Sequence, residues 1–180
     1  MTGSGTISRP AAPPSSATRL RTSRRSSAGS ARKAARASSS SATIWGTSYT
    51  LAHFLDRGLV TPPLFVQTIF GVLGGIGSLA EDLQHMKRTA DRLFGDAYLW
   101  SVLAAGARQI PLVTAAAIQG AHVRVGLEDS LWIGPGELAN GNAEQVAKIV
   151  RILGELGMRP ATPAEARELL ALKGGDKVAF

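Results

Sequence analysis

The chain has 180 residues, a formal net charge of +7 and no cysteine. Its length suggests one domain or part of a larger one, and the absence of cysteine excludes disulfide bonds and thiolate metal sites. No run approaches the roughly 18 consecutive apolar residues of a membrane helix. We therefore expect a cytoplasmic globular protein that does not act in a membrane.

The positive charge is concentrated in residues 1–42. Eight of the 20 basic residues and none of the 13 acidic residues lie there, so the rest of the chain carries 12 basic and 13 acidic side chains and a formal net charge of −1. The segment consists mostly of Ser, Ala and Arg. Such a composition buries too little apolar surface to offset the entropy of ordering, so we expect residues 1–42 to be disordered.

Three interpretations of this tail are open. It could bind nucleic acid, which makes a non-enzymatic nucleic-acid-binding protein the alternative function, although the tail has no aromatic residue for base stacking. It could be an organellar transit peptide, which is also Arg- and Ser-rich and poor in acids. It could also be a wrong-frame translation of a GC-rich gene, and we favour this third interpretation.

Patterned sequence extends from about residue 49 to residue 173, and residues 174–180 should fray. Helices are expected over 51–59, from a capping box of Ser78 and Glu81, over 111–118, from Asn142 to Gly157, and from Thr162. Apolar runs predict buried strands over 64–70, 98–104 and 122–127. The stripe spaced for burial on the long fourth helix is Val146, Ile149, Val150, Leu153 and Leu156.

This alternation of helices and strands predicts an α/β fold with parallel strands and crossover helices. A closed barrel of this kind needs eight strands. Three strands alone would leave two sheet edges unpaired. The patterned segment is therefore predicted to be part of something larger.

The run from His122 to Asp129 reads H-V-R-V-G-L-E-D and is the best candidate for chemistry. Side chains alternate along a strand, so Arg124 and Glu128 would share the face opposite Val123. Adjacent carboxylates where a strand opens into a loop are costly unless a cation, a metal or a substrate compensates them. From these residues alone, a solvated acidic corner that caps a loop is the favoured interpretation.

The segment from about Thr50 to Lys173 resembles the C-terminal half of the β-keto acid cleavage enzymes, the family of the 3-keto-5-aminohexanoate cleavage enzyme. The matching stretches are Leu51–Val60, Pro62–Gly77, His85–Gly95, Val123–Asp129, Asn142–Val146 and Ala161–Arg167. The resemblance implies the C-terminal portion of a TIM (β/α)8 barrel. It also implies a divalent metal, usually zinc, and an assembly of several copies for the intact enzyme. The implied reaction converts a β-keto acid and acetyl-CoA into acetoacetate and a new CoA thioester.

The resemblance also implies residue roles. Glu128 would be the glutamate ligand of the metal, and Arg124 and Asp129 would handle the substrate and the proton transfer. An arginine beside an aspartate is expected to lower the proton affinity of that carboxylate. A weaker expectation places a phosphate of CoA near Gly74, Gly75 or Arg108, because glycine-rich turns before helices bind anions.

The two other metal ligands of the family are histidines spaced H-x-H on an early strand. This chain has only His53, His85 and His122, which are too far apart for that motif, and we expect structural roles for them. A zinc site needs about three protein ligands. The sequence therefore predicts an incomplete enzyme that is inactive alone and prone to aggregate.

Overall fold

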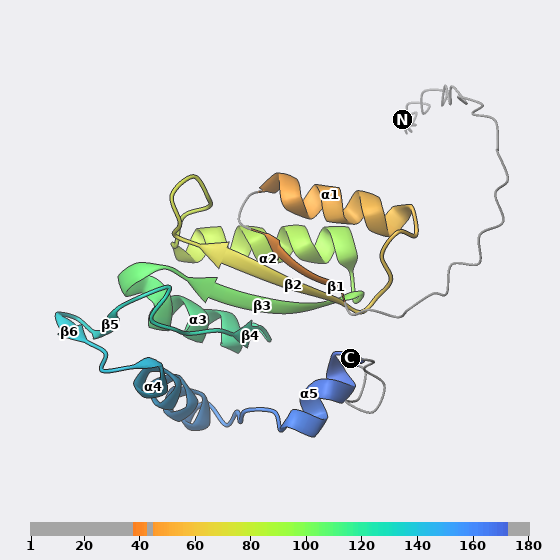
Figure 1. Cartoon of the computed structure of the whole chain (residues 1–180). Helices are drawn as coiled ribbons and strands as arrows, with labels where there is room; N and C mark the ends of the chain where they lie inside the picture. The colour runs from red at the N-terminus through yellow and green to blue at the C-terminus, as the bar shows by residue number, and fades with distance from the viewer. Residues whose placement is uncertain (1–37, 43–44, 173–180) are drawn as a thin grey trace, which may run out of the picture. The chain divides into compact units, whose positions relative to one another are not determined.

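The computed structural model describes residues 38–42 and 45–172 of the chain. The elements follow in this order (Figure 1): β1 (Ser38–Ala42), α1 (Trp45–Asp56), β2 (Leu64–Phe70), α2 (Ala80–Phe94), β3 (Tyr98–Ala104), the 3-10 helix η1 (Gly106–Arg108), α3 (Gln109–Ile118), β4 (His122–Val123), β5 (Trp132–Gly134), β6 (Glu137–Leu138), α4 (Asn142–Glu155) and α5 (Pro163–Leu169). None of the described helices has the length and apolar character that crossing a membrane requires.

The main sheet contains four parallel strands in the order β1-β2-β3-β4, which is also their order along the chain. The three expected strands are present, and a fourth that was not expected joins them, because β1 pairs with β2 from Ser38 opposite Leu64 to Ala42 opposite Thr68. This strand lies inside the segment 1–42 that was expected to be disordered. Backbone hydrogen bonds hold a strand to its neighbour, so a run of Ser and Ala can pair without an apolar pattern. Residues 1–37 of the tail lie outside the described residues.

Two clusters of buried side chains join the sheet to the helices. The larger cluster consists of Phe70, Leu83, Met86, Trp100, Val102, Ala104, Leu112, Val113, Ala116 and Ile149. The smaller cluster consists of Leu51, Leu64, Val66, Ala90 and Phe94. The parallel register places Leu64, Val66 and Phe70 beside Tyr98, Trp100 and Ala104. Laterally paired residues point to the same side of a sheet, so both clusters cover one face.

The opposite face of the sheet is less covered along β2, whereas Ser101 and Leu103 of β3 are buried on that face. Phe65, Gln67 and Ile69 alternate with the buried residues of β2, are half-buried and belong to neither cluster. In α/β barrels the helices form an outer ring around the sheet, whereas doubly wound folds carry helices on both faces of the sheet. The fold is thus mixed α/β and compatible with part of a barrel, and closure into a barrel stays a prediction.

Helix starts differ from the expected ones where local hydrogen bonding decides them. Helix α1 begins at Trp45 and ends at Asp56, earlier than the expected span 51–59. The capping box of Ser78 and Glu81 is wrong by one residue, because the Leu79 N–H donates to Asp82 Oδ2 over 2.9 Å. Helix α5 does begin at its expected cap, since the Thr162 side chain accepts from the Glu165 N–H and the Glu165 carboxylate accepts from the Thr162 N–H.

Helix α4 is less buried than its apolar pattern predicts. Of the expected stripe, Ile149 is buried at 4% exposure, while Val146, Val150 and Leu156 are 46%, 37% and 44% exposed. The inner side of the helix is completed instead by Gln145, which is fully buried. The outer part of the stripe is therefore an apolar surface in contact with solvent.

This surface should make the chain self-associate, since large exposed apolar patches mark contact or aggregation sites. Replacing Val150 by lysine should reduce the associated fraction measured by light scattering, with an unchanged circular dichroism spectrum. Ala147→Lys is the matched control, because it adds the same charge at an exposed position of the same helix outside the stripe. Equal effects of the two substitutions would mean that net charge, and not this surface, controls association.

Candidate active site

The candidate catalytic residues lie in a tight turn just after β4. The strand is shorter than the expected span 122–127, although the Arg124 N–H still donates to the Val102 carbonyl over 3.0 Å. The N–H groups of Asp129 and Ser130 then both donate to the Gly126 carbonyl over 3.1 Å. The chain thus folds back at residues 127–129, and this brings both carboxylates toward Arg124.

Arg124 bridges the two carboxylates. Its Nη2 lies 2.7 Å from Glu128 Oε1 and 3.5 Å from Asp129 Oδ2. The side chains of Arg124 and Glu128 are 43% and 55% exposed, whereas that of Asp129 is only 16% exposed. Gly126 permits this arrangement, because a Cβ there would collide with the Glu128 carboxylate.

Burial separates the proton affinities of the two carboxylates. The pKa of Asp129 is raised, because burial and the Glu128 charge together outweigh the lowering by Arg124. The pKa of Glu128 is lowered by a backbone hydrogen bond and by Arg124. Arg124 does lower the proton affinity of Asp129, as expected, but burial and the Glu128 charge raise it by more. Neighbouring carboxylates with opposite shifts suit acid and base roles.

A complete zinc site is not formed by the part of the chain that the structure describes. No group of three or more His, Cys, Asp or Glu side chains gathers there. Glu128 is the one expected ligand, and its Oε1 is engaged by Arg124. His122 begins β4, with its ring centroid 6.4 Å from that of Phe65. A tetrahedral site needs about three protein ligands, so the described residues do not fit one.

In the glycine-rich loop after β2, backbone groups form hydrogen bonds with one another. The Gly75 N–H donates to the Val72 carbonyl over 3.0 Å, and Gly74 adopts a positive φ of 78° in the same turn. The Asp82 carboxylate already binds the Leu79 N–H at the start of α2. A CoA-binding role for Gly74 and Gly75 stays a prediction.

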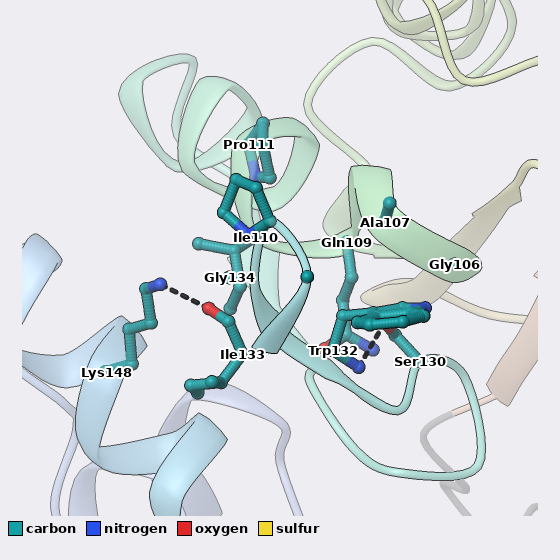
Figure 2. Close-up of a pocket in the computed structure, with 12 residues that line it drawn as sticks. Gly106, Ala107, Gln109, Ile110, Pro111, Ser130, Trp132, Ile133, Gly134 and Lys148 are labelled. Atoms are coloured by element: carbon teal, nitrogen blue, oxygen red, sulfur yellow. Dashed lines mark hydrogen bonds between the residues drawn. The ribbon is translucent and has the colours of Figure 1, made fainter. Parts of the chain in front are cut away.

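Arg108, the third expected cofactor-binding residue, ends η1 and is exposed. Its two neighbours, Ala107 and Gln109, line a cavity of about 500 Å³ between η1, the start of α3, the β5–β6 hairpin and Lys148 (Figure 2). The cavity adjoins the turn of residues 127–129, because the Gly106 N–H donates to the Asp129 carbonyl over 2.7 Å and Ser130 lines the cavity wall. The sequence did not predict this cavity.

Two buried glutamines bind backbone carbonyls of the turn through their side-chain amides. The sequence analysis did not predict them. Gln109 Nε2 donates to the Gly126 carbonyl over 3.0 Å, and Gln145 Nε2 donates to the Ser130 carbonyl over 2.6 Å. Their side-chain oxygens have no hydrogen-bond partner among the described residues. The sequence does place each glutamine on the buried side of its helix. That position alone does not predict which loop the side-chain amide binds.

These features define an α/β protein with a charged site where a parallel strand ends. A model of the beta-keto acid cleavage enzyme family matches residues 35–172, and the chain belongs to this family. The resemblance seen in the sequence is thus confirmed. The match also includes residues 35–42, so the end of the expected tail is part of the family segment.

Several characterised relatives share this segment. The chain is 60% identical over 132 residues to the 3,5-dioxohexanoate:acetyl-CoA acetone transferase of Paraburkholderia graminis, covering 73% of this chain and 43% of the relative. It is 36% identical over 120 residues to the 3-keto-5-aminohexanoate cleavage enzyme of Fusobacterium nucleatum subsp. nucleatum, covering 67% of this chain and 42% of the relative. The chain therefore spans less than half the length of these relatives.

Proposed function

We propose that this chain is the C-terminal part of an enzyme that reacts a β-keto acid with acetyl-CoA to give acetoacetate and a new acyl-CoA. The observation that carries the proposal is the bridge from Arg124 to both Glu128 and Asp129 at the end of β4. Catalytic residues of α/β barrels collect at the carboxyl ends of their strands. The names of the relatives support acetyl-CoA as co-substrate.

In the proposed reaction, Asp129 exchanges a proton with the carbon between the two carbonyl groups of the keto acid. Its raised pKa suits a group that must both take up and return a proton. Arg124 holds the Asp129 carboxylate in place and offers its guanidinium to a substrate carboxylate, since a guanidinium pairs well with carboxylate geometry. Glu128 stays ionised, because its pKa is lowered.

Glu128 is the one described residue that we propose as a ligand of a divalent metal. This carboxylate would supply one ligand of a divalent ion, and the described residues do not supply the others. No step above is assigned to a metal. We propose further that the remaining ligands belong to the part of the enzyme for which this chain has no counterpart, which is why we expect no turnover from the chain alone.

A chimaera tests the proposal. Residues 35–172 would replace the matching segment of the Paraburkholderia graminis relative, and consumption of 3,5-dioxohexanoate and acetyl-CoA would be followed. Because the two segments are closely similar, we expect turnover within about tenfold of the parent rate, which corresponds to about 1.4 kcal/mol. The 180-residue chain assayed in parallel should show none.

Two outcomes would contradict the proposal. A chimaera that folds like its parent but gives no turnover would mean that this segment has lost its catalytic function. Turnover by the 180-residue chain alone would mean that the described site is complete without further segments. The parent enzyme with its own segment reinserted by the same cloning route is the control.

A further inference from the structure

One backbone carbonyl organises the turn that carries Glu128 and Asp129. The Gly126 carbonyl accepts from the N–H groups of Asp129 and Ser130, each over 3.1 Å. It also accepts from Gln109 Nε2 over 3.0 Å, and this third donor belongs to a residue 17 positions earlier in the chain. The side-chain amide of Gln109 therefore links the centre of the turn to the first residue of α3.

Helix α3 is a fixed support for this link. Leu112, Val113 and Ala116 belong to the larger buried cluster, together with the buried side chains at the ends of β2 and β3. Gln109 itself is only 1% exposed. Because protein interiors are close-packed and hardly compressible, the position of the Gln109 amide is set by the core and not by the turn that it binds.

The segment of η1 and α3 holds the turn at two points. The Gly106 N–H, at the start of η1, donates to the Asp129 carbonyl over 2.7 Å. Gln109 binds the Gly126 carbonyl at the other end of the turn. One hydrogen bond alone would leave the turn free to pivot about it, whereas two bonds to separate residues fix its orientation. The bond from Gln109 therefore determines how the turn is oriented.

Arg124 is anchored separately from the turn. Its N–H donates to the Val102 carbonyl of β3 over 3.0 Å, and its Nη2 lies 3.5 Å from Asp129 Oδ2. The main chain of Arg124 is thus positioned by β3, and that of Asp129 by η1 and α3. A pivot of the turn would change the distance between the guanidinium and the Asp129 carboxylate, although neither anchor moves.

The Gln109 amide contributes little to stability. Without it, the Gly126 carbonyl keeps two backbone donors, so no buried acceptor is left without a partner. In addition, Gln109 Oε1 has no hydrogen-bond partner among the described residues, and a buried polar atom without a partner is costly. An apolar side chain of the same length should therefore be tolerated by the fold. The orientation of the turn explains a buried amide at this position better than stability does.

We propose that Gln109 is a positioning residue, which holds the Asp129 carboxylate beside Arg124 by fixing the Gly126 carbonyl. The inference rests on the proposed function, because the role of Asp129 in proton transfer comes from there. Gln109 acts through the turn and not on the substrate. Small displacements of a reacting group matter, since a misplacement of about 1 Å lowers a reaction rate by as much as about 100-fold.

The first test is Gln109→Met in the 180-residue chain, because methionine has a similar length and no amide. The urea midpoint should stay unchanged, while the N–H groups of Asp129 and Ser130 should exchange with deuterium about tenfold faster, since exchange reports local opening. Gln119→Met is the matched control, because Gln119 Nε2 donates to the Ala115 carbonyl of α3 and not to the turn. It should leave exchange in the turn unchanged.

Gln145→Met gives the comparison for a structural glutamine. Gln145 Nε2 donates to the Ser130 carbonyl over 2.6 Å, and this carbonyl has no other hydrogen-bond donor among the described residues. Its loss leaves a buried acceptor without a partner, so the urea midpoint should fall. A midpoint lowered as much in Gln109→Met as in Gln145→Met would make Gln109 structural and overturn the inference.

In the chimaera, Gln109→Met should lower kcat about tenfold or more with little change in the KM for acetyl-CoA, because a side chain that is 1% exposed offers little surface to a ligand. Gln109→Leu should behave in the same way and replaces methionine if the first variant does not fold. An unchanged kcat would overturn the inference and leave the proposed function intact. A chimaera without turnover would contradict the proposed function, and unchanged exchange at Asp129 and Ser130 would then overturn the inference independently.

Discussion

Replacing Asp129 by asparagine in the chimaera should lower kcat/KM by about 100- to 10,000-fold, the usual contribution of a positioned acid or base. Asparagine keeps the shape of the side chain but cannot carry the proton. Burial raises the pKa of Asp129, and a base must be ionised to act. The activity of the unmodified chimaera should therefore fall toward low pH at a value above the ordinary aspartate range, and this step should vanish in the variant.

Glu155→Gln is the matched control, because it removes a carboxylate from the exposed end of α4, outside the turn. It should leave both the rate and the pH profile unchanged. A loss below fivefold in Asp129→Asn, with the pH step retained, would assign the proton transfer to another group. Asp129 would then have no role in the proton transfer, and Arg124 and Glu128 would form an ion pair beside it.

Replacing Phe70 by alanine should lower the free energy of unfolding by about 3–5 kcal/mol, the usual cost of truncating a buried phenylalanine. Phe70 is fully buried in the larger cluster, at the end of β2, and its carbonyl accepts from the Ala105 N–H over 2.9 Å. Domains are typically stable by only about 5–15 kcal/mol. The variant should therefore unfold at much lower urea concentration than the unmodified chain.

Leu73→Ala provides the control a few residues away, because this side chain is fully exposed in the loop after β2. Its free energy of unfolding, obtained from urea titration, should stay within about 0.5 kcal/mol of that of the unmodified chain. Phe70→Leu, which refills most of the space, should give a smaller loss than alanine and keeps the comparison measurable if the alanine variant does not fold. Equal midpoints for all three variants would contradict the assignment of Phe70 to the core.

The strands that bury apolar side chains were predictable, and the others were not. The predicted spans 64–70 and 98–104 agree with β2 and β3 at both ends, because continuous apolar runs between turn residues define them. By contrast, β1 consists of Ser and Ala and is held by backbone pairing. The alternation of Val123, Val125 and Leu127 continues beyond β4, since pairing with β3 ends at Val123 while the apolar pattern does not.

In the candidate site, too, the features set by neighbouring residues were predictable, and those that depend on distant segments were not. The adjacency of Glu128 and Asp129 and the proximity of Arg124 follow from the sequence, and the structure brings their charged groups together. The raised pKa of Asp129 depends on burial, which its sequence neighbours alone do not determine. The cavity likewise combines residues of η1, α3, the β5–β6 hairpin and α4. No single stretch of the sequence could therefore predict it.

The strand order of the sheet has a consequence for how the protein is made. In the main sheet, β2, β3 and β4 each pair with the strand immediately before them in the chain. A nascent polypeptide leaves the ribosome from its N-terminus, and domains assemble during synthesis in that direction. Pairing between sequence neighbours also keeps loop closure short, which speeds folding. Every strand from β2 onward therefore meets an existing partner as soon as it emerges, and the sheet can grow stepwise during translation.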